Sequence, residues 1–117
     1  MSRRLVLDPD VEHDLDAIFD AIAADNPVAA QRYIHALRER CEFYTASPLL
    51  GQAEPDIAVR LSLAPDQVRS FLYRNHRCYY VVTDEEMRVF GFIDTRSTGR
   101  RRWTNGYRAK SASAQVR

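Results

Sequence analysis

Lysine is almost absent from this sequence. Of its seventeen basic residues only Lys110 is a lysine, and the others are arginines. A buried lysine can lose its proton and act as a base, whereas an arginine stays charged in proteins. Lysine-dependent proton transfer is therefore excluded from the chain before Lys110.

Cysteines and long apolar runs are scarce as well. Cys41 and Cys78 stand far apart in periodic segments without the spacing of metal ligands, which favours buried free thiols over a disulfide bridge. No run of about eighteen apolar residues could span a membrane, and the run after Met1–Arg4 is too short for a secretory signal. We therefore expect a soluble, cytoplasmic protein that uses no membrane, no metal and no cofactor.

Acidic residues are missing from the end of the chain. After Asp94 there are seven bases and no acid, which leaves ten bases and sixteen acids in residues 1–94. A chain of 117 residues supports one core, so we predict a single domain over residues 1–96 and a basic, partly disordered tail over 97–117. The Arg100–Trp103 segment could contact nucleic acid, or it could simply be a solvated tail.

The centre of the second half predicts a three-stranded antiparallel meander. Val68–Tyr73, Arg77–Thr83 and Met87–Ile93 are rich in the Val, Phe and Tyr that suit strands, and turn residues separate them. Period-two alternation divides the strands into two faces. In the middle strand one face has Cys78, Tyr80 and Val82, and the other has Arg77, Tyr79, Val81 and Thr83. In the last strand one face has Met87, Val89, Gly91 and Ile93, and the other has Arg88, Phe90 and Phe92. We expect one face to be covered and the other to be left bare for a partner.

Two helices precede the sheet in the sequence. Asp8-Pro9 and Asn26-Pro27 each combine a capping residue with a proline suited to the first helical turn. Apolar stripes follow, and the short break at Asp25–Pro27 predicts an antiparallel hairpin. Arg3–Leu7 adds an expected edge strand, while Gln52–Asp66 is expected to be irregular, with a short strand or a turn of helix. The order predicts an α+β fold, in which a helical hairpin packs on a small antiparallel β-sheet.

The first helix is strongly acidic at its start, with Asp10, Glu12, Asp14 and Asp16. Carboxylates are favoured there by the helix dipole, which gives a purely structural explanation. A metal site would need ligands that converge on one face, and His13 lies between these acids only in sequence.

Several segments together resemble the ParE branch of the RelE/ParE toxin superfamily over about residues 3 to 96. They are the acidic first helix, the Asp-Asn-Pro break with Ala29–Ile34, the Ser47-Pro48 and Gly51 exit, Val68–Phe71, Cys78–Tyr80 and Val89–Ile93. The resemblance implies the toxin of a bacterial type II toxin–antitoxin pair, held in a hetero-oligomer by a cognate antitoxin, expected to be a ParD-like ribbon-helix-helix protein. ParE-like members poison DNA gyrase, whereas RelE-like members cut messenger RNA on the ribosome.

The residues can be compared with both branches. RNA cleavage needs a base, donors for the phosphate charge and an acid, which lysines, arginines and a terminal tyrosine or histidine supply in the ribonuclease branch. Where many relatives carry a histidine after the last strand, this chain has Asp94. His76 is expected in an exposed turn, and Trp103 and Tyr107 fall in the tail. We therefore expect a non-enzymatic gyrase-directed toxin, with a ribonuclease or a non-toxic antitoxin-binding relative as the alternatives.

A toxin without chemistry of its own must act through an interface. Arginines mixed with aromatic side chains are typical of interface hot spots. The expected residues for target or antitoxin binding are Arg69, Phe71, Arg77, Tyr79, Arg88, Asp94 and Arg96, although each arginine alone could merely solvate the sheet. An antitoxin arm could lie on the helical hairpin and add a strand to the sheet edge.

Overall fold

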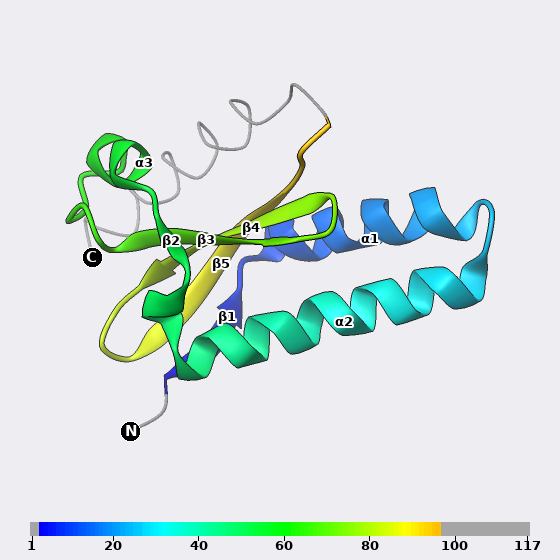
Figure 1. Cartoon of the computed structure of the whole chain (residues 1–117), viewed down its shortest axis with the longest axis horizontal. Helices are drawn as coiled ribbons and strands as arrows, with labels where there is room; N and C mark the ends of the chain where they lie inside the picture. Colours follow the sequence, from blue (N-terminus) through cyan, green and yellow to red (C-terminus); the bar gives the residue numbers. More distant parts are fainter. Residues whose placement is uncertain (1–2, 97–117) are drawn as a thin grey trace.

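The computed structural model describes residues 3–96 and shows a two-layer α+β domain (Figure 1). In chain order its elements are β1 (Arg4–Leu7), α1 (Pro9–Ala23), α2 (Pro27–Ala46), a 3-10 turn (Pro48–Leu50), β2 (Gln52–Ala53), α3 (Pro55–Arg60), β3 (Val68–Tyr73), β4 (His76–Val82) and β5 (Glu86–Asp94). The five strands form one sheet in the order β1-β5-β4-β3-β2. Only β1 and β5 are parallel, and the other pairs are antiparallel.

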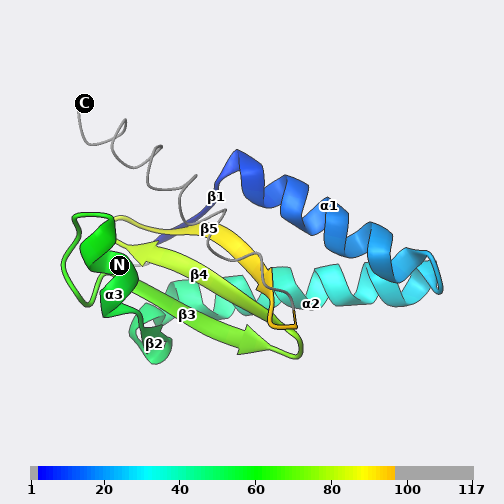
Figure 2. The same cartoon turned by 90° about the horizontal axis from the view of Figure 1, so that it is seen from above.

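The predicted architecture is confirmed. The meander β3–β5, the edge strand β1 and the helical hairpin all form where the sequence predicts them, and the irregular connection contains both β2 and the short helix α3. Both α1 and α2 extend beyond the end of the sheet, as two perpendicular views show (Figures 1 and 2). The tail predicted at 97–117 lies outside the described residues.

The two expected helix caps behave differently. The side-chain oxygen of Asn26 accepts a hydrogen bond from the backbone N–H of Ala29 at 3.1 Å, which caps α2 as predicted. The side chain of Asp8 makes no capping bond to α1, so that part of the prediction is wrong. Its carboxylate instead accepts a hydrogen bond from Arg88 at 2.7 Å. A charged partner on β5 therefore replaces the local amide.

The main core lies between the helical hairpin and the sheet. Val11 and Leu15 of α1 and Leu37 of α2 are almost fully buried against inward-facing residues of the strands. Tyr44 stacks on Phe71 with ring centroids 4.4 Å apart and planes within 6°. The thiols of Cys41 and Cys78 are buried and free, as predicted, and burial raises the pKa of Cys78.

A β-bulge changes the predicted faces of β5. Tyr80 pairs with Val89, but the next pair along the ladder joins Tyr79 to Gly91, so Phe90 is the extra residue inserted into β5. The extra residue reverses the alternation beyond it. Phe92 therefore packs in the core beneath the helices, whereas Ile93 faces the opposite side, contrary to the period-two prediction.

The opposite face of the sheet is not bare. A second cluster joins Ala58 and Leu61, in and just after α3, to the outward residues Val68, Tyr79, Val81, Phe90 and Ile93. Helix α3 thus lies across the sheet from α2 (Figures 1 and 2). The prediction of a fully open second face is wrong, because the connection between β2 and β3 folds back over it.

A buried corner links the helices to the sheet. Tyr80 is completely buried, and its hydroxyl donates a 2.6 Å hydrogen bond to the carbonyl oxygen of Pro48. Gly51 lies so close to the Tyr80 hydroxyl and to the carbonyl oxygen of Ser70 that a Cβ atom would overlap both. The corner after α2 therefore requires a residue without a side chain.

Within residues 3–96, no helix is both long enough and apolar enough to cross a membrane. The same part of the chain contains no group of three or more histidine, cysteine or carboxylate side chains that could hold a metal ion. The acids of α1 thus form no such group among the described residues.

The Tyr80–Pro48 bond gives the first prediction. Tyr80→Phe should lower the free energy of unfolding by about 1–3 kcal/mol, because the Pro48 carbonyl loses its buried donor. Urea denaturation followed by circular dichroism measures the change. Tyr44→Phe is the matched control, since the Tyr44 ring keeps its stacking on Phe71. Equal stability of Tyr80→Phe and the wild type would contradict the argument.

Candidate binding site

The residues predicted to bind a target do not form one cluster. Phe71 and Tyr79 are buried on opposite faces of the sheet, in the helix-side core and under α3 respectively. The remaining residues occupy the β2 edge, the outer face, the β1–β5 edge and the end of β5. They are Arg69, Arg77, Arg88, Asp94 and Arg96. Each position has its own set of partners.

Arg69 links several backbone segments at the β2 edge of the sheet. Its guanidinium donates hydrogen bonds to the carbonyl oxygens of Gly51 at 3.1 Å, Asp66 at 3.0 Å and Leu49 at 3.3 Å. These carbonyls come from the 3-10 turn and from the loops on either side of the β2–α3 segment. Arg69 therefore has a structural role that its position in the sequence does not reveal.

Arg77 belongs to a polar chain on the outer face. It donates to the hydroxyl of Ser70 at 3.0 Å, and that hydroxyl donates to the carboxylate of Glu54 at 2.6 Å. Ser70 is fully buried and lies opposite Tyr79 in the β3–β4 ladder. The chain holds the residue before α3 against the sheet and satisfies a buried hydroxyl.

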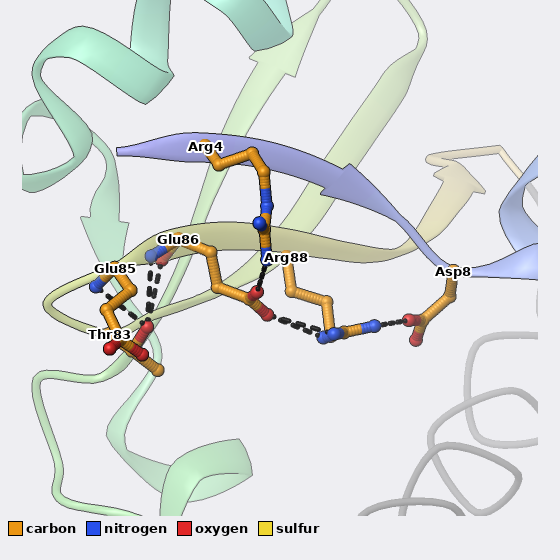
Figure 3. A network of polar contacts seen from close by, with 6 residues as sticks. All are labelled: Arg4, Asp8, Thr83, Glu85, Glu86 and Arg88. Atoms are coloured by element: carbon orange, nitrogen blue, oxygen red, sulfur yellow. Dashed lines mark hydrogen bonds and ion pairs between the residues drawn. The ribbon is translucent and has the colours of Figure 1, made fainter. Parts of the chain in front are cut away.

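Arg88 joins β5 to the beginning of α1. Its guanidinium lies 2.7 Å from the carboxylate of Asp8 and 2.9 Å from that of Glu86 (Figure 3). Arg4 of β1 approaches the other oxygen of Glu86 at 3.3 Å, so two arginines share this carboxylate (Figure 3). The Asp8 side chain is only 7% exposed, whereas that of Arg88 is 39% exposed. The network fixes the parallel edge strand while one side of Arg88 stays accessible.

The end of β5 holds the last charged pair. Hydrogen bonds from the guanidinium and the backbone N–H of Arg96 lower the pKa of Asp94 to about 2. His76 of β4 lies opposite Asp94 in the ladder. Its Nδ1 atom is 2.7 Å from the hydroxyl of Tyr33 on α2. Burial lowers the pKa of His76, with Asp94 and Arg96 acting on it in opposite directions.

Sequence reasoning missed the partners that orient these side chains. The Asp-Pro pattern predicts a cap at Asp8, and neither it nor the apolar stripe around Tyr33 contains a sign of the long-range contact. Glu54 belongs to the segment expected to be irregular, and the alternation of Val68–Tyr73 does not reveal which partner Ser70 has. The expected position of His76 in an exposed turn is wrong, because it is the first residue of β4 and is partly buried.

Comparison with known proteins identifies the family. Residues 5–102 match the family model described as the ParE toxin of the type II toxin-antitoxin system, parDE. The chain belongs to the ParE toxin family. Among curated proteins no significant match is found. A solved structure titled as the chromosomal ParDE toxin–antitoxin system from P. aeruginosa has the same fold, with a TM-score of 0.62 and 21% identity, covering 80% of this chain and 96% of that chain.

The Arg88 network of this ParE-family protein generates a stability prediction. Arg88→Ala should cost about 1–3 kcal/mol, because the nearly buried Asp8 carboxylate loses its charged partner. Arg4→Ala, which removes an exposed arginine from the same network, should cost about 0–1 kcal/mol. Urea midpoints measured side by side test the ranking, and equal costs would show that Asp8 does not depend on Arg88.

The position of His76 predicts how stability depends on pH. An unfolded histidine has a pKa of about 6.5, and burial lowers the pKa of His76 in the folded state. Between the two values the unfolded chain binds more protons, so this contribution is fully present above about 6.5 and is lost as the pH falls through the folded pKa. His76→Gln should flatten the change in urea midpoint between about pH 7.5 and pH 5.5. His35→Gln, which alters an exposed histidine, should leave the wild-type slope. An unchanged slope in His76→Gln would contradict the assignment.

Proposed function

We propose that this protein arrests growth by binding DNA gyrase, and that a cognate ribbon-helix-helix antitoxin neutralises it. The match of residues 5–102 to the ParE toxin model carries this proposal. The solved relative supports the fold on which it depends. The proposed action is mechanical rather than chemical: the toxin acts by occupying its target, without cleaving a bond in it.

The protonation and the hydrogen-bond partners of the charged groups favour a binding function over RNA cleavage. A general base works best when its pKa lies near the operating pH. The pKa of about 2 makes the Asp94 carboxylate a weak base, and its charge would repel a phosphate backbone. His76 is engaged by Tyr33, and Arg69 by three carbonyl oxygens. These groups have structural partners in place of a substrate.

The proposed target-binding residues are the arginines that keep an accessible side. Arg96 is the most exposed of them, with 68% of its side chain accessible, and Asp94 holds its guanidinium in a bidentate pair. Arg88 is 39% exposed and held from two sides. Guanidinium groups that are fixed before binding lose less conformational entropy at an interface.

The sheet edge offers the proposed place for the antitoxin arm. Strand β2 pairs only with Arg69 and Ser70, so no strand within residues 3–96 covers the edge of β3 beyond Ser70. Leu72 on this part is about half exposed, and Leu49 and Leu50 are exposed beside β2. An extended segment could continue the sheet there through backbone hydrogen bonds, with apolar side chains over the leucines.

A supercoiling assay tests the proposed target. Purified toxin incubated with gyrase, ATP and relaxed plasmid should prevent supercoiling or leave cleaved plasmid, and added antitoxin should reverse the effect. Cleavage of ribosome-bound messenger RNA at defined codons, with gyrase unaffected, would overturn the proposal and favour the ribonuclease alternative. Absence of both activities, with antitoxin binding retained, would identify a non-toxic relative.

Arg96→Ala should relieve growth arrest. After induction, cells that express this variant should give viable counts about tenfold or more higher than cells that express the wild-type toxin. The change removes an exposed guanidinium, so the urea midpoint should stay close to that of the wild type. Arg60→Ala, an exposed arginine on α3, is the control and should remain toxic. Full toxicity of folded Arg96→Ala would remove this residue from the proposed interface.

A further inference from the structure

A groove outside the predicted site lies where the helical hairpin meets the tip of the β3–β4 hairpin. It has a volume of about 300 Å³, at the lower end of the range for ligand pockets. Ile22 at the end of α1 and Val28 and Ala29 at the start of α2 give it apolar walls. Val28 is 56% exposed, so the apolar surface reaches the rim of the groove.

The other walls of the groove are aromatic and positively charged. Tyr33 of α2 and Tyr73 of β3 line it, together with Arg32 and Arg74. The two tyrosine rings are 5.5 Å apart. The Tyr33 hydroxyl forms hydrogen bonds with Nδ1 of His76 and with the backbone oxygen of Tyr73, so the ring is held in place. The aromatic wall is therefore formed before any ligand binds.

The arginines of the groove differ from most others in the described part of the chain. Carboxylates, hydroxyls or backbone carbonyls engage Arg3, Arg4, Arg38, Arg69, Arg77, Arg88 and Arg96. Within residues 3–96, no carboxylate lies within ion-pair distance of Arg32, Arg40 or Arg74. Arg60 on α3 also has no such partner in this part of the chain, but the other three lie close together: Arg32 and Arg74 line the groove, and Arg40 lies over the ring of Tyr73.

Two of these guanidinium groups lie over the aromatic ring of Tyr73. The guanidinium carbon of Arg74 lies 5.5 Å from the centre of the Tyr73 ring, and that of Arg40 lies 5.6 Å from it. Cation–π contacts of this kind orient a guanidinium without neutralising it. Arg74 also has a φ of 53°, in the left-handed region that is uncommon for residues other than glycine. The turn holds this charge at the mouth of the groove.

We propose that this groove binds a segment of a protein partner in which one apolar or aromatic side chain is flanked by aspartate or glutamate. The apolar side chain enters between Ile22, Val28 and Ala29, where it removes exposed carbon from water. The neighbouring carboxylates pair with Arg32 and Arg74, which have no carboxylate partner in residues 3–96. None of the gyrase-binding residues proposed above lines the groove, and the proposal does not depend on the identity of that target.

The charge of the surrounding domain favours a short acidic peptide over a nucleic acid. Residues 1–94 carry six more acids than bases, and exposed Asp16, Asp20 and Asp25 belong to α1 and to the turn beside the groove. A long phosphate backbone would meet this negative field, because the positive patch is limited to a few arginines. A peptide with carboxylates close to one apolar anchor needs only the patch itself.

Peptide selection on the full-length protein tests the proposal. A random heptapeptide phage library should yield peptides with an aromatic or aliphatic residue next to acids. Their fluorescein-labelled forms should bind in anisotropy titrations, and affinity should fall as salt is raised. The Arg32→Ala and Arg74→Gly double variant should weaken binding by about tenfold or more, since each change removes a charged hydrogen-bond donor. Glycine suits the left-handed backbone at residue 74, so the turn should keep its shape.

Arg38→Ala is the matched control, because Arg38 belongs to the same helix but pairs with Glu12 away from the groove. It should bind the selected peptides as the wild type does. Failure of the library to enrich such peptides, equal binding by the double variant, or tighter binding of a labelled thymidine oligonucleotide through the same arginines would each overturn the proposal. Unchanged urea midpoints would show that the loss of binding is not a loss of folding.

Discussion

The structure depends on a strand pair that is buried on both of its faces. Strands β4 and β5 lie at the centre of the sheet, between α1 and α2 on one side and α3 on the other. Because both faces are packed, most of their charged residues lie near the ends and edges of the strands, and Arg77 on the outer face is held by Ser70. This explains why Arg88 is found at the β1–β5 edge, and Asp94 and His76 at the open end of the strands. Possible binding surfaces are therefore also expected at the ends and edges of these strands.

Local patterns in the sequence were sufficient to predict the helices and strands. They were not sufficient to predict what covers the sheet face opposite the helical hairpin. The helix start at Asn26-Pro27 and the strand Val68–Tyr73 both depend on interactions between residues close in sequence. The structure has the helix and the strand at these positions. The bulge at Phe90 depends on how two strands pair, and the position of α3 depends on a cluster of contacts far apart in sequence. Neither leaves a periodic signal. The predicted family and fold were therefore correct, while the predicted open face was not.

In the candidate site, too, local sequence patterns predict some side-chain contacts, whereas long-range contacts decide others. Asp8 and Asn26 occupy equivalent positions before a proline, yet only Asn26 caps its helix, because Arg88 lies within reach of Asp8. A charged partner in a partly buried position forms a stronger bond than a neutral amide. Which arginine is structural and which is free for a partner is thus decided by tertiary contacts, as the three carbonyls around Arg69 also show.

These contacts give a physical criterion for separating structural from functional arginines in this domain. An arginine whose donors are already occupied must break bonds before it can bind a partner, whereas one that only stacks on a ring keeps its donors available. Arg69 belongs to the first class. Arg74 is closer to the second, because within residues 3–96 it interacts with the Tyr73 side chain but with no carboxylate or backbone carbonyl. Arg96 is intermediate, because its pair with Asp94 is exposed and is weakened by solvent. A small domain that is packed on both sides of its sheet can therefore still present more than one binding surface, provided that their charges are held at its margins.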